Sequence, residues 1–174
     1  MSILTRIFGG KPERETFRPL YSEVVAIGRD PAWYREGNVP DTLDGRFDMI
    51  AAVLALVLLR LERDGPASAG ASVLLTELFI DDMDGSIRQM GIGDLMVGKH
   101  VGRMMSALGG RLTAFREAMA AGTGFEAAVR RNVFHEASPS KAALRFLSSR
   151  LEKFSAALDR KPTAALLAGE VPRP

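Results

Sequence analysis

Apolar residues recur every three or four positions along most of this chain, which is the repeat of one face of an α-helix. The longest stripe consists of Leu43, Phe47, Ile50, Leu54, Leu58 and Leu61. Further apolar residues at 53, 56, 57 and 59 widen this stripe, so we expect a helix that is buried on most sides. Asp41 and Thr42 both have side chains suited to capping its N-terminus.

The same repeat predicts helices over residues 13–28, 71–90, 95–121, 139–158 and 163–168. Pro19 places the start of the first of these near that residue. Thr123 and Glu126 have the spacing of a capping box, which predicts a short helix ending near residue 134. Pro139 suits the first position of the helix after it. Strand-like alternation is absent, so we predict an all-α fold: a single compact bundle of about six to seven helices, with no sheet.

Two of these helices have stripes that the sequence assigns to the core. In the 71–90 helix the stripe is Leu74, Leu75, Leu78, Phe79, Met83 and Ile87. In the 95–121 helix it is Val97, Val101, Met104, Leu108, Leu112, Phe115 and Met119. We expect these residues to face the interior of the bundle.

The length of 174 residues suits one domain. We expect residues 1–12 to be a flexible N-terminal segment and residues 13–174 to be the helical domain. The N-terminal segment carries Ile3, Leu4, Ile7 and Phe8, so contact with a membrane surface is the alternative to a loose tail. The longest apolar run, residues 49–59, is eleven residues long, whereas a spanning helix needs about 20.

Composition excludes several kinds of chemistry. The sequence contains no cysteine, which rules out disulfides, thiolate nucleophiles and cysteine-bound metals. Its two histidines, His100 and His135, lack a metal-ligand or axial-haem context, so we expect surface or interface positions and no cofactor. The formal charge is +2, but residues 1–94 carry −5 and residues 95–174 carry +7. This asymmetry predicts either two distinct surfaces or two regions that attract each other.

An acidic cluster, Asp81-Asp82-Met83-Asp84, is the one candidate for metal chemistry. Magnesium-dependent enzymes acting on diphosphates use carboxylates on one helix face, facing a second acidic cluster. Asp81 and Asp84 share a face, but Asp82 points elsewhere, and a second cluster is missing. A solvated acidic face is therefore the favoured interpretation, and we predict that the protein is not an enzyme.

The helix predicted over residues 95–121 contains Gly98, Gly102, Gly109 and Gly110. Each glycine inside a helix costs roughly 1 kcal/mol relative to alanine, so these residues need an explanation. Small residues on one face allow another helix to approach closely. The approaching helix belongs either to this chain or to a partner, and a break of the helix at Gly109-Gly110 is the third interpretation.

Two segments of the chain are similar to a known family. They are Pro40-Asp41-Thr42-Leu43-Asp44-Gly45-Arg46-Phe47-Asp48-Met49, and Asp81-Asp82-Met83-Asp84 through Met90-Gly91-Ile92-Gly93-Asp94-Leu95-Met96-Val97-Gly98-Lys99. Together with the ending Leu166-Leu167-Ala168-Gly169, they resemble the ubiquinol–cytochrome c chaperone family, in particular its members from α-proteobacteria. The likeness extends over roughly residues 10–172.

The resemblance implies an all-helical, non-enzymatic assembly factor of respiratory complex III. Mitochondrial relatives bind newly made cytochrome b near the ribosomal exit tunnel and assist its incorporation into the complex. We therefore expect cytochrome b as the client, with the ribosome as a second candidate partner and without DNA binding. We also expect a monomer in the cytoplasm, with peripheral contact at the inner membrane as an extension of that location.

An apolar client needs an apolar groove with a charged rim. We place this surface around the 91–99 turn, the acidic cluster and the loop from Tyr34 to Arg46. Arg46 is expected to pair with an acid of residues 81–84, and Met96 is the methionine expected to be exposed. The predicted client-binding residues are Tyr34, Arg46, Asp81, Asp82, Asp84, Gly91, Gly93, Asp94, Met96, Gly98, Lys99 and Gly102. The same residues are equally suited to maintaining the fold.

The alternative is a helical adaptor that binds the ribosome or RNA through the basic C-terminal half. Its expected contacts are Arg130, Arg131, Lys141, Arg145 and Arg150. Binding through such residues weakens steeply with added salt, whereas apolar client binding does not.

Overall fold

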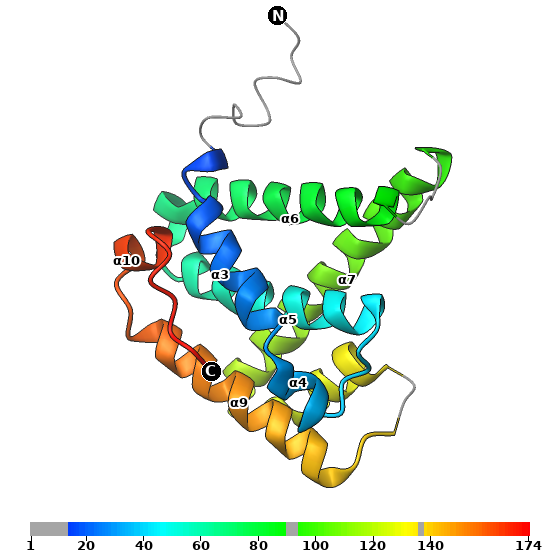
Figure 1. Ribbon diagram of the computed structural model, residues 1–174. Helices are drawn as coiled ribbons and strands as arrows, with labels where there is room; N and C mark the ends of the chain where they lie inside the picture. The colour runs from blue at the N-terminus through cyan, green and yellow to red at the C-terminus, as the bar shows by residue number, and fades with distance from the viewer. Residues whose placement is uncertain (1–13, 90–93, 136–137) are drawn as a thin grey trace, which may run out of the picture.

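The computed structural model describes residues 14–89, 94–135 and 138–174, and its described residues contain helices but no strand (Figure 1). The all-α prediction is therefore confirmed. The long helices are α3 (Arg18–Gly28), α5 (Leu43–Glu62), α6 (Ala69–Gln89), α7 (Asp94–Ala121) and α9 (Lys141–Asp159). Short helical segments lie between and after them: α4 (Pro31–Arg35), η1 (Gly65–Ser68), α8 (Glu126–Val129), η2 (Arg130–Phe134) and α10 (Thr163–Leu167).

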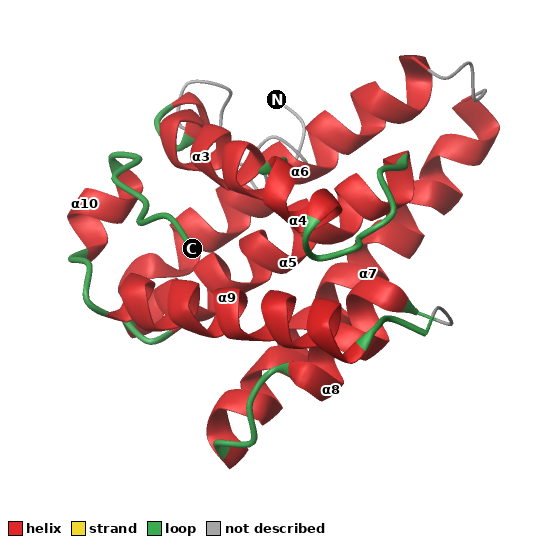
Figure 2. Ribbon diagram, turned by 60° about the horizontal axis from the view of Figure 1, so that its bottom comes forward, coloured by secondary structure: helices red, strands yellow, loops and turns green. Residues whose placement is uncertain are grey.

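Helix α5 is the centre of the bundle, as its wide apolar stripe predicts. Every residue from 48 to 59 is buried, because α3, α6, α7 and α9 all pack against this helix (Figure 2). Thr42 caps it: the Gly45 N–H donates to Thr42 Oγ1 at 3.1 Å. Of the two predicted caps, Thr42 is therefore the one used.

Two predicted helix starts are wrong. The N-cap of α9 is Ser140, whose Oγ accepts from the Ala143 N–H at 3.1 Å, so the helix begins after Pro139. The capping box at Thr123 does not form. The N–H of Phe125, the residue before α8, instead donates to Oε1 of Glu152 on α9 at 2.7 Å.

Helices α6 and α7 are arranged as a V. They converge where the end of α6 approaches the start of α7, and they diverge away from that end (Figures 1 and 2). Helix α5 contacts both of them. Among the helices that the structure describes, none is both long and apolar enough to cross a membrane.

Candidate functional site

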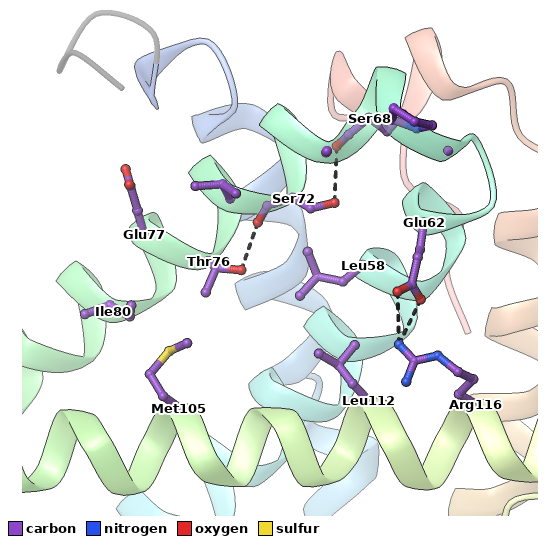
Figure 3. A pocket seen from close by; sticks show the side chains of 14 residues that line it. Leu58, Glu62, Ser68, Ser72, Thr76, Glu77, Ile80, Met105, Leu112 and Arg116 are labelled. Carbon is purple, nitrogen blue, oxygen red and sulfur yellow. Dashed lines mark hydrogen bonds and ion pairs between the residues drawn. The ribbon is translucent and has the colours of Figure 1, made fainter. Parts of the chain in front are cut away.

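An apolar groove of about 670 Å³ opens between α6 and α7 (Figure 3). Its lining includes Val73, Thr76 and Ile80 from α6, Met105 and Leu112 from α7, and Leu58 from α5. Among the described residues, three large apolar side chains are exposed, and two of them line this groove: Val73 at 52% and Met105 at 37%. Two of the three exposed large apolar side chains of the described residues thus lie in one groove.

Four of the polar side chains that line the groove are bonded within the protein, and Glu77 is an exception. Ser72 Oγ donates to the Ser68 carbonyl at 3.2 Å, and Thr76 Oγ1 donates to the Ser72 carbonyl at 2.8 Å. At the diverging end, Arg116 Nη2 lies 2.9 and 3.1 Å from the two carboxylate oxygens of Glu62. The surface therefore suits an occupant that brings apolar atoms and few hydrogen-bonding groups.

A charged residue on the flank of the groove faces elsewhere. The buried Glu77 carboxylate is turned away from α7 (Figure 3), and Arg14 Nη1 lies 3.8 Å from its Oε2. Neither oxygen of Glu77 accepts a hydrogen bond from the described residues. The positive charge of the Arg14 guanidinium therefore offsets the negative charge of the Glu77 carboxylate without a hydrogen bond between them.

Glycines continue the groove-facing side of α7. Gly98, Gly102, Met105, Gly109, Leu112 and Arg116 follow one another in steps of four and three residues, which places them on one helix face. A Cβ added at Gly98, Gly102 or Gly109 would meet no described atom within 4 Å. Helix α7 runs unbroken through Gly109-Gly110. The helix break is therefore excluded, and no helix among the described residues packs on Gly98, Gly102 or Gly109. An external partner for this face stays a prediction.

Arg46 does not pair with the acids of residues 81–84, so that prediction is wrong. Its Nε donates to Oδ1 of Asp41 at 2.7 Å, five residues earlier in the chain. Arg46 does line a small cavity of about 90 Å³ together with Met83 and Ser86, so the two family-like segments are neighbours. Asp41 is much nearer to Arg46 along the chain than the acids of residues 81–84 are, and Arg46 pairs with it.

Tyr34 of α4 stabilises the connection between α3 and α4. Its hydroxyl donates to the Gly28 carbonyl at 2.8 Å, and burial raises the pKa of Tyr34 to about 12. The side chain is half-buried, so only part of it is accessible to a partner.

Each acid of the 81–84 cluster is engaged within the protein. Asp81 Oδ2 lies 2.7 Å from Arg14 Nη1, and Asp82 Oδ2 accepts from the Tyr21 hydroxyl at 2.8 Å. Asp84 Oδ2 accepts from Arg88 Nε at 2.7 Å. Asp82 thereby fastens α3 to α6. Within the described residues, no group of three or more His, Cys, Asp or Glu side chains is placed to hold a metal ion.

The 91–99 segment is only partly described. Gly91 and Gly93 lie outside the described residues, as do the side chains of Asp94 and Met96. The other predicted residues of α7, Gly98, Lys99 and Gly102, are exposed. None of the predicted client-binding residues within the described part lines the α6–α7 groove, although Gly98 and Gly102 continue its face on α7. Their client-binding role stays a prediction.

The structure contains a buried ion pair that the sequence pattern does not predict. Asp48 of α5 and Arg111 of α7 are 5% and 1% exposed. Arg111 Nη2 donates to Asp48 Oδ1 and to the Asn132 carbonyl, and His135 Nε2 lies 2.8 Å from Asp48 Oδ2. Burial raises the pKa of the Asp48 carboxyl and lowers the pKa of the Arg111 guanidinium. The sequence offers one sign of this pair, since Asp48 directly precedes the longest apolar run, residues 49–59.

Arg150, one of the expected nucleic-acid contacts, has a structural role instead. Its Nη2 lies 2.5 Å from Oδ2 of Asp30, and its guanidinium lies 4.3 Å from the centre of the Trp33 ring. Asp30 also caps α4 by accepting from the Ala32 N–H at 2.9 Å. The remaining expected contacts, Arg130, Arg131, Lys141 and Arg145, are exposed.

Comparison with known proteins agrees with the resemblance seen in the sequence. Residues 35–173 match the family model described as ubiquinol-cytochrome C chaperone. The crystal structure of the Cbp3 homolog from Brucella abortus, an α-proteobacterium, is similar with a TM-score of 0.80 and 27% identity. The alignment covers 94% of this chain and 92% of that chain. No curated protein matches the sequence. Since the family model spans most of its length, the chain belongs to the ubiquinol–cytochrome c chaperone family.

Proposed function

We propose that this protein holds newly made cytochrome b during assembly of complex III, and that the α6–α7 groove is its client-binding surface. Family membership supports the role in assembly. The observation that carries the choice of surface is the accessible apolar lining of the groove, with Val73 and Met105 exposed. The protein acts by binding, and no catalytic step is part of the proposal.

The chemistry of the client fits this surface. Cytochrome b is a bundle of apolar transmembrane helices, which expose apolar side chains until they pack together in the membrane. The groove offers apolar contact, and the hydroxyls of Ser72 and Thr76 place no hydrogen-bonding demand on an occupant. Covering the client in this way reduces its aggregation before assembly.

The proposed client surface extends beyond the groove toward the start of α7. Gly98 and Gly102 lie on the same face as Met105, and Lys99 is exposed beside them. We further propose that the protein works as a monomer at the cytoplasmic face of the inner membrane, because an inserting membrane protein is accessible there.

Site-specific photo-crosslinking in cells tests the proposal. A photoreactive amino acid is placed at Val73 or Met105, with Ser149 on the exposed side of α9 as the matched control position. Cytochrome b is the expected main adduct from Val73 and Met105, and it is not expected from Ser149. Ribosomal proteins as the sole adducts would contradict the proposal and favour the adaptor alternative. Cytochrome b adducts from Ser149 alone would place the client surface on another face.

A further inference from the structure

We infer that the α6–α7 groove receives one apolar helix of the client, with the C-terminal end of that helix directed toward Lys99 and Arg103. This inference rests on the proposed function and adds the shape and the direction of the occupant. Three features of the described residues carry it: the all-helical walls, the bare face of α7, and the placement of unpaired charge.

The walls of the groove favour a helix over an extended segment. They are formed by helices, whose backbone N–H and C=O groups bond within each helix. An extended client segment would find no strand edge to pair with, and its backbone groups would be left unsatisfied against an apolar surface. A helix satisfies its own backbone and presents only side chains.

The length of the groove matches a short stretch of helix. Its lining extends from Ala69 to Ile80 on α6 and from Met105 to Arg116 on α7. Each span corresponds to roughly 16 Å, or about three helical turns. Beyond Met105, the open positions at Gly102 and Gly98 lengthen the α7 wall.

The glycine face of α7 allows close approach of the client helix. A Cβ added at Gly98, Gly102 or Gly109 would meet no described atom, so the backbone of α7 is accessible there. Helices with small residues in contact pack with their backbones close together, which is the common mode in membrane proteins. Met105 lies between Gly102 and Gly109, Leu112 follows Gly109, and both line the groove and supply apolar contacts.

The charge around the groove gives the helix a direction. At the diverging end, Glu62 and Arg116 neutralise each other. At the converging end, Lys99 and Arg103 are exposed, and neither forms an ion pair with a described residue. A helix C-terminus carries about half a negative charge, so it is attracted to this end. The end of α6 approaches the start of α7 here (Figure 1), so the partial charges of these two helix ends offset each other and the direction rests on Lys99 and Arg103.

A pair of labelled peptides tests the direction. Both contain the same leucine–alanine core of about twelve residues, with three lysines either at the N-terminus or at the C-terminus. Fluorescence anisotropy measures their affinity for the full chain at low salt. The peptide with N-terminal lysines is expected to bind about fivefold more tightly, because its lysines lie away from Lys99 and Arg103. The double variant Lys99→Glu, Arg103→Glu should reverse this preference. Equal affinities in the unaltered chain would overturn the direction.

A glycine substitution tests whether the client helix packs on the glycine face of α7. Gly102→Leu fills the open face of α7 and should weaken peptide binding at least about tenfold. Gly85→Leu on α6 is the matched control, because a Cβ added there also meets nothing within 4 Å and Gly85 does not line the groove. Both changes raise helix propensity, so both variants should stay folded by circular dichroism. Unchanged affinity of the Gly102→Leu variant would overturn the inference.

Cell assays separate this inference from the proposed function. A strain that lacks the chain and still assembles complex III normally would overturn the proposed function, whatever the peptides do. The deletion strain could instead lose complex III and be fully restored by the Gly102→Leu variant. That result would overturn the binding of a client helix on the glycine face of α7 and leave the proposed function in place.

Discussion

The Arg111 guanidinium on α7 and the Asp48 carboxylate on α5 form an ion pair inside the bundle, with both side chains almost completely buried. Asp48 belongs to the 40–49 segment that carries part of the family resemblance. In this structure, Asp48 holds helices together and does not face a partner. Gly45 and Thr42 of the same segment also serve the fold, through close packing and capping. This segment therefore identifies the architecture more than the client surface.

Breaking the Asp48–Arg111 pair should strongly destabilise the protein. Arg111→Met leaves the Asp48 charge buried without its main partner, and the expected loss is about 3–5 kcal/mol in the free energy of unfolding. The double variant Asp48→Leu, Arg111→Met should lose much less, because no buried charge remains. Urea denaturation measures both. Arg18→Met, which breaks an exposed pair with Glu15, is the control and should leave the free energy of unfolding almost unchanged, because solvent screens this pair. Equal losses in the single and double variants would contradict the buried pair.

Two glycines should respond to alanine in opposite directions. A Cβ at Gly45 would lie 2.0 Å from the Pro40 carbonyl oxygen, so Gly45→Ala should destabilise the protein by about 2–3 kcal/mol. At Gly102 there is open space, and Gly102→Ala should stabilise α7 by up to about 1 kcal/mol. Thermal unfolding compares the two. A stable Gly45→Ala variant would mean that the start of α5 is looser than described.

Asp30 should contribute to the acid sensitivity of the fold. Burial by itself raises the pKa of Asp30, but the Ala32 N–H and the Arg150 guanidinium outweigh it and hold the pKa below its ordinary 3.8. The folded protein thus binds this proton more weakly than the unfolded chain. Stability from Asp30 is present above pH 3.8 and is lost as the pH falls through the folded pKa.

Urea denaturation between about pH 5 and about pH 3 tests the role of Asp30. Asp30→Asn keeps an oxygen for the α4 cap and removes the titrating group, so this variant should lose less stability on acidification than the unaltered chain. Asp159→Asn, at an exposed pair with Arg63, controls for general changes in charge. Identical pH profiles for the Asp30→Asn variant and the unaltered chain would contradict the prediction.

A charge placed in the groove should separate folding from function. Val73 is 52% exposed, so Val73→Asp should change the free energy of unfolding by less than about 0.5 kcal/mol. The same change places an unpaired charge against an apolar client, which should sharply lower complex III assembly in cells. Ser149→Asp on α9 is the control and should assemble complex III normally. Normal assembly with the Val73→Asp variant would exclude this wall from client binding.

The sequence predicted the helices well because their signals are local. The stripe from Leu43 to Leu61 and the Thr42 cap are encoded within one helix, and the structure contains both. The start of α8 was mispredicted because its stabilising acceptor, Glu152, comes from another helix. Long-range partners of this kind leave no trace in the spacing of the residues beside them.

The sequence does not predict the α6–α7 groove either, because the groove also depends on contacts between distant parts of the chain. It exists because α6 and α7 diverge, and the angle between two helices is set by how they pack on α5. Still, Val73, Ile80 and Met105 are apolar residues that lie off the predicted core stripes. Apolar side chains on the polar side of a helix were the available signal. The pairing of Arg46 with Asp41 had a signal too, since Asp41 lies just before α5 and Arg46 follows it by five residues, near the start of that helix.

The limited length of the groove has a consequence for how a client would leave. About three turns of one helix face can be covered here, whereas the hydrocarbon core of a bilayer is about 30 Å thick and surrounds a helix on every side. Hydrocarbon contact would therefore increase when a bound helix moves from the protein into lipid. Release into the membrane would run downhill in free energy, so the bilayer itself would drive the handover.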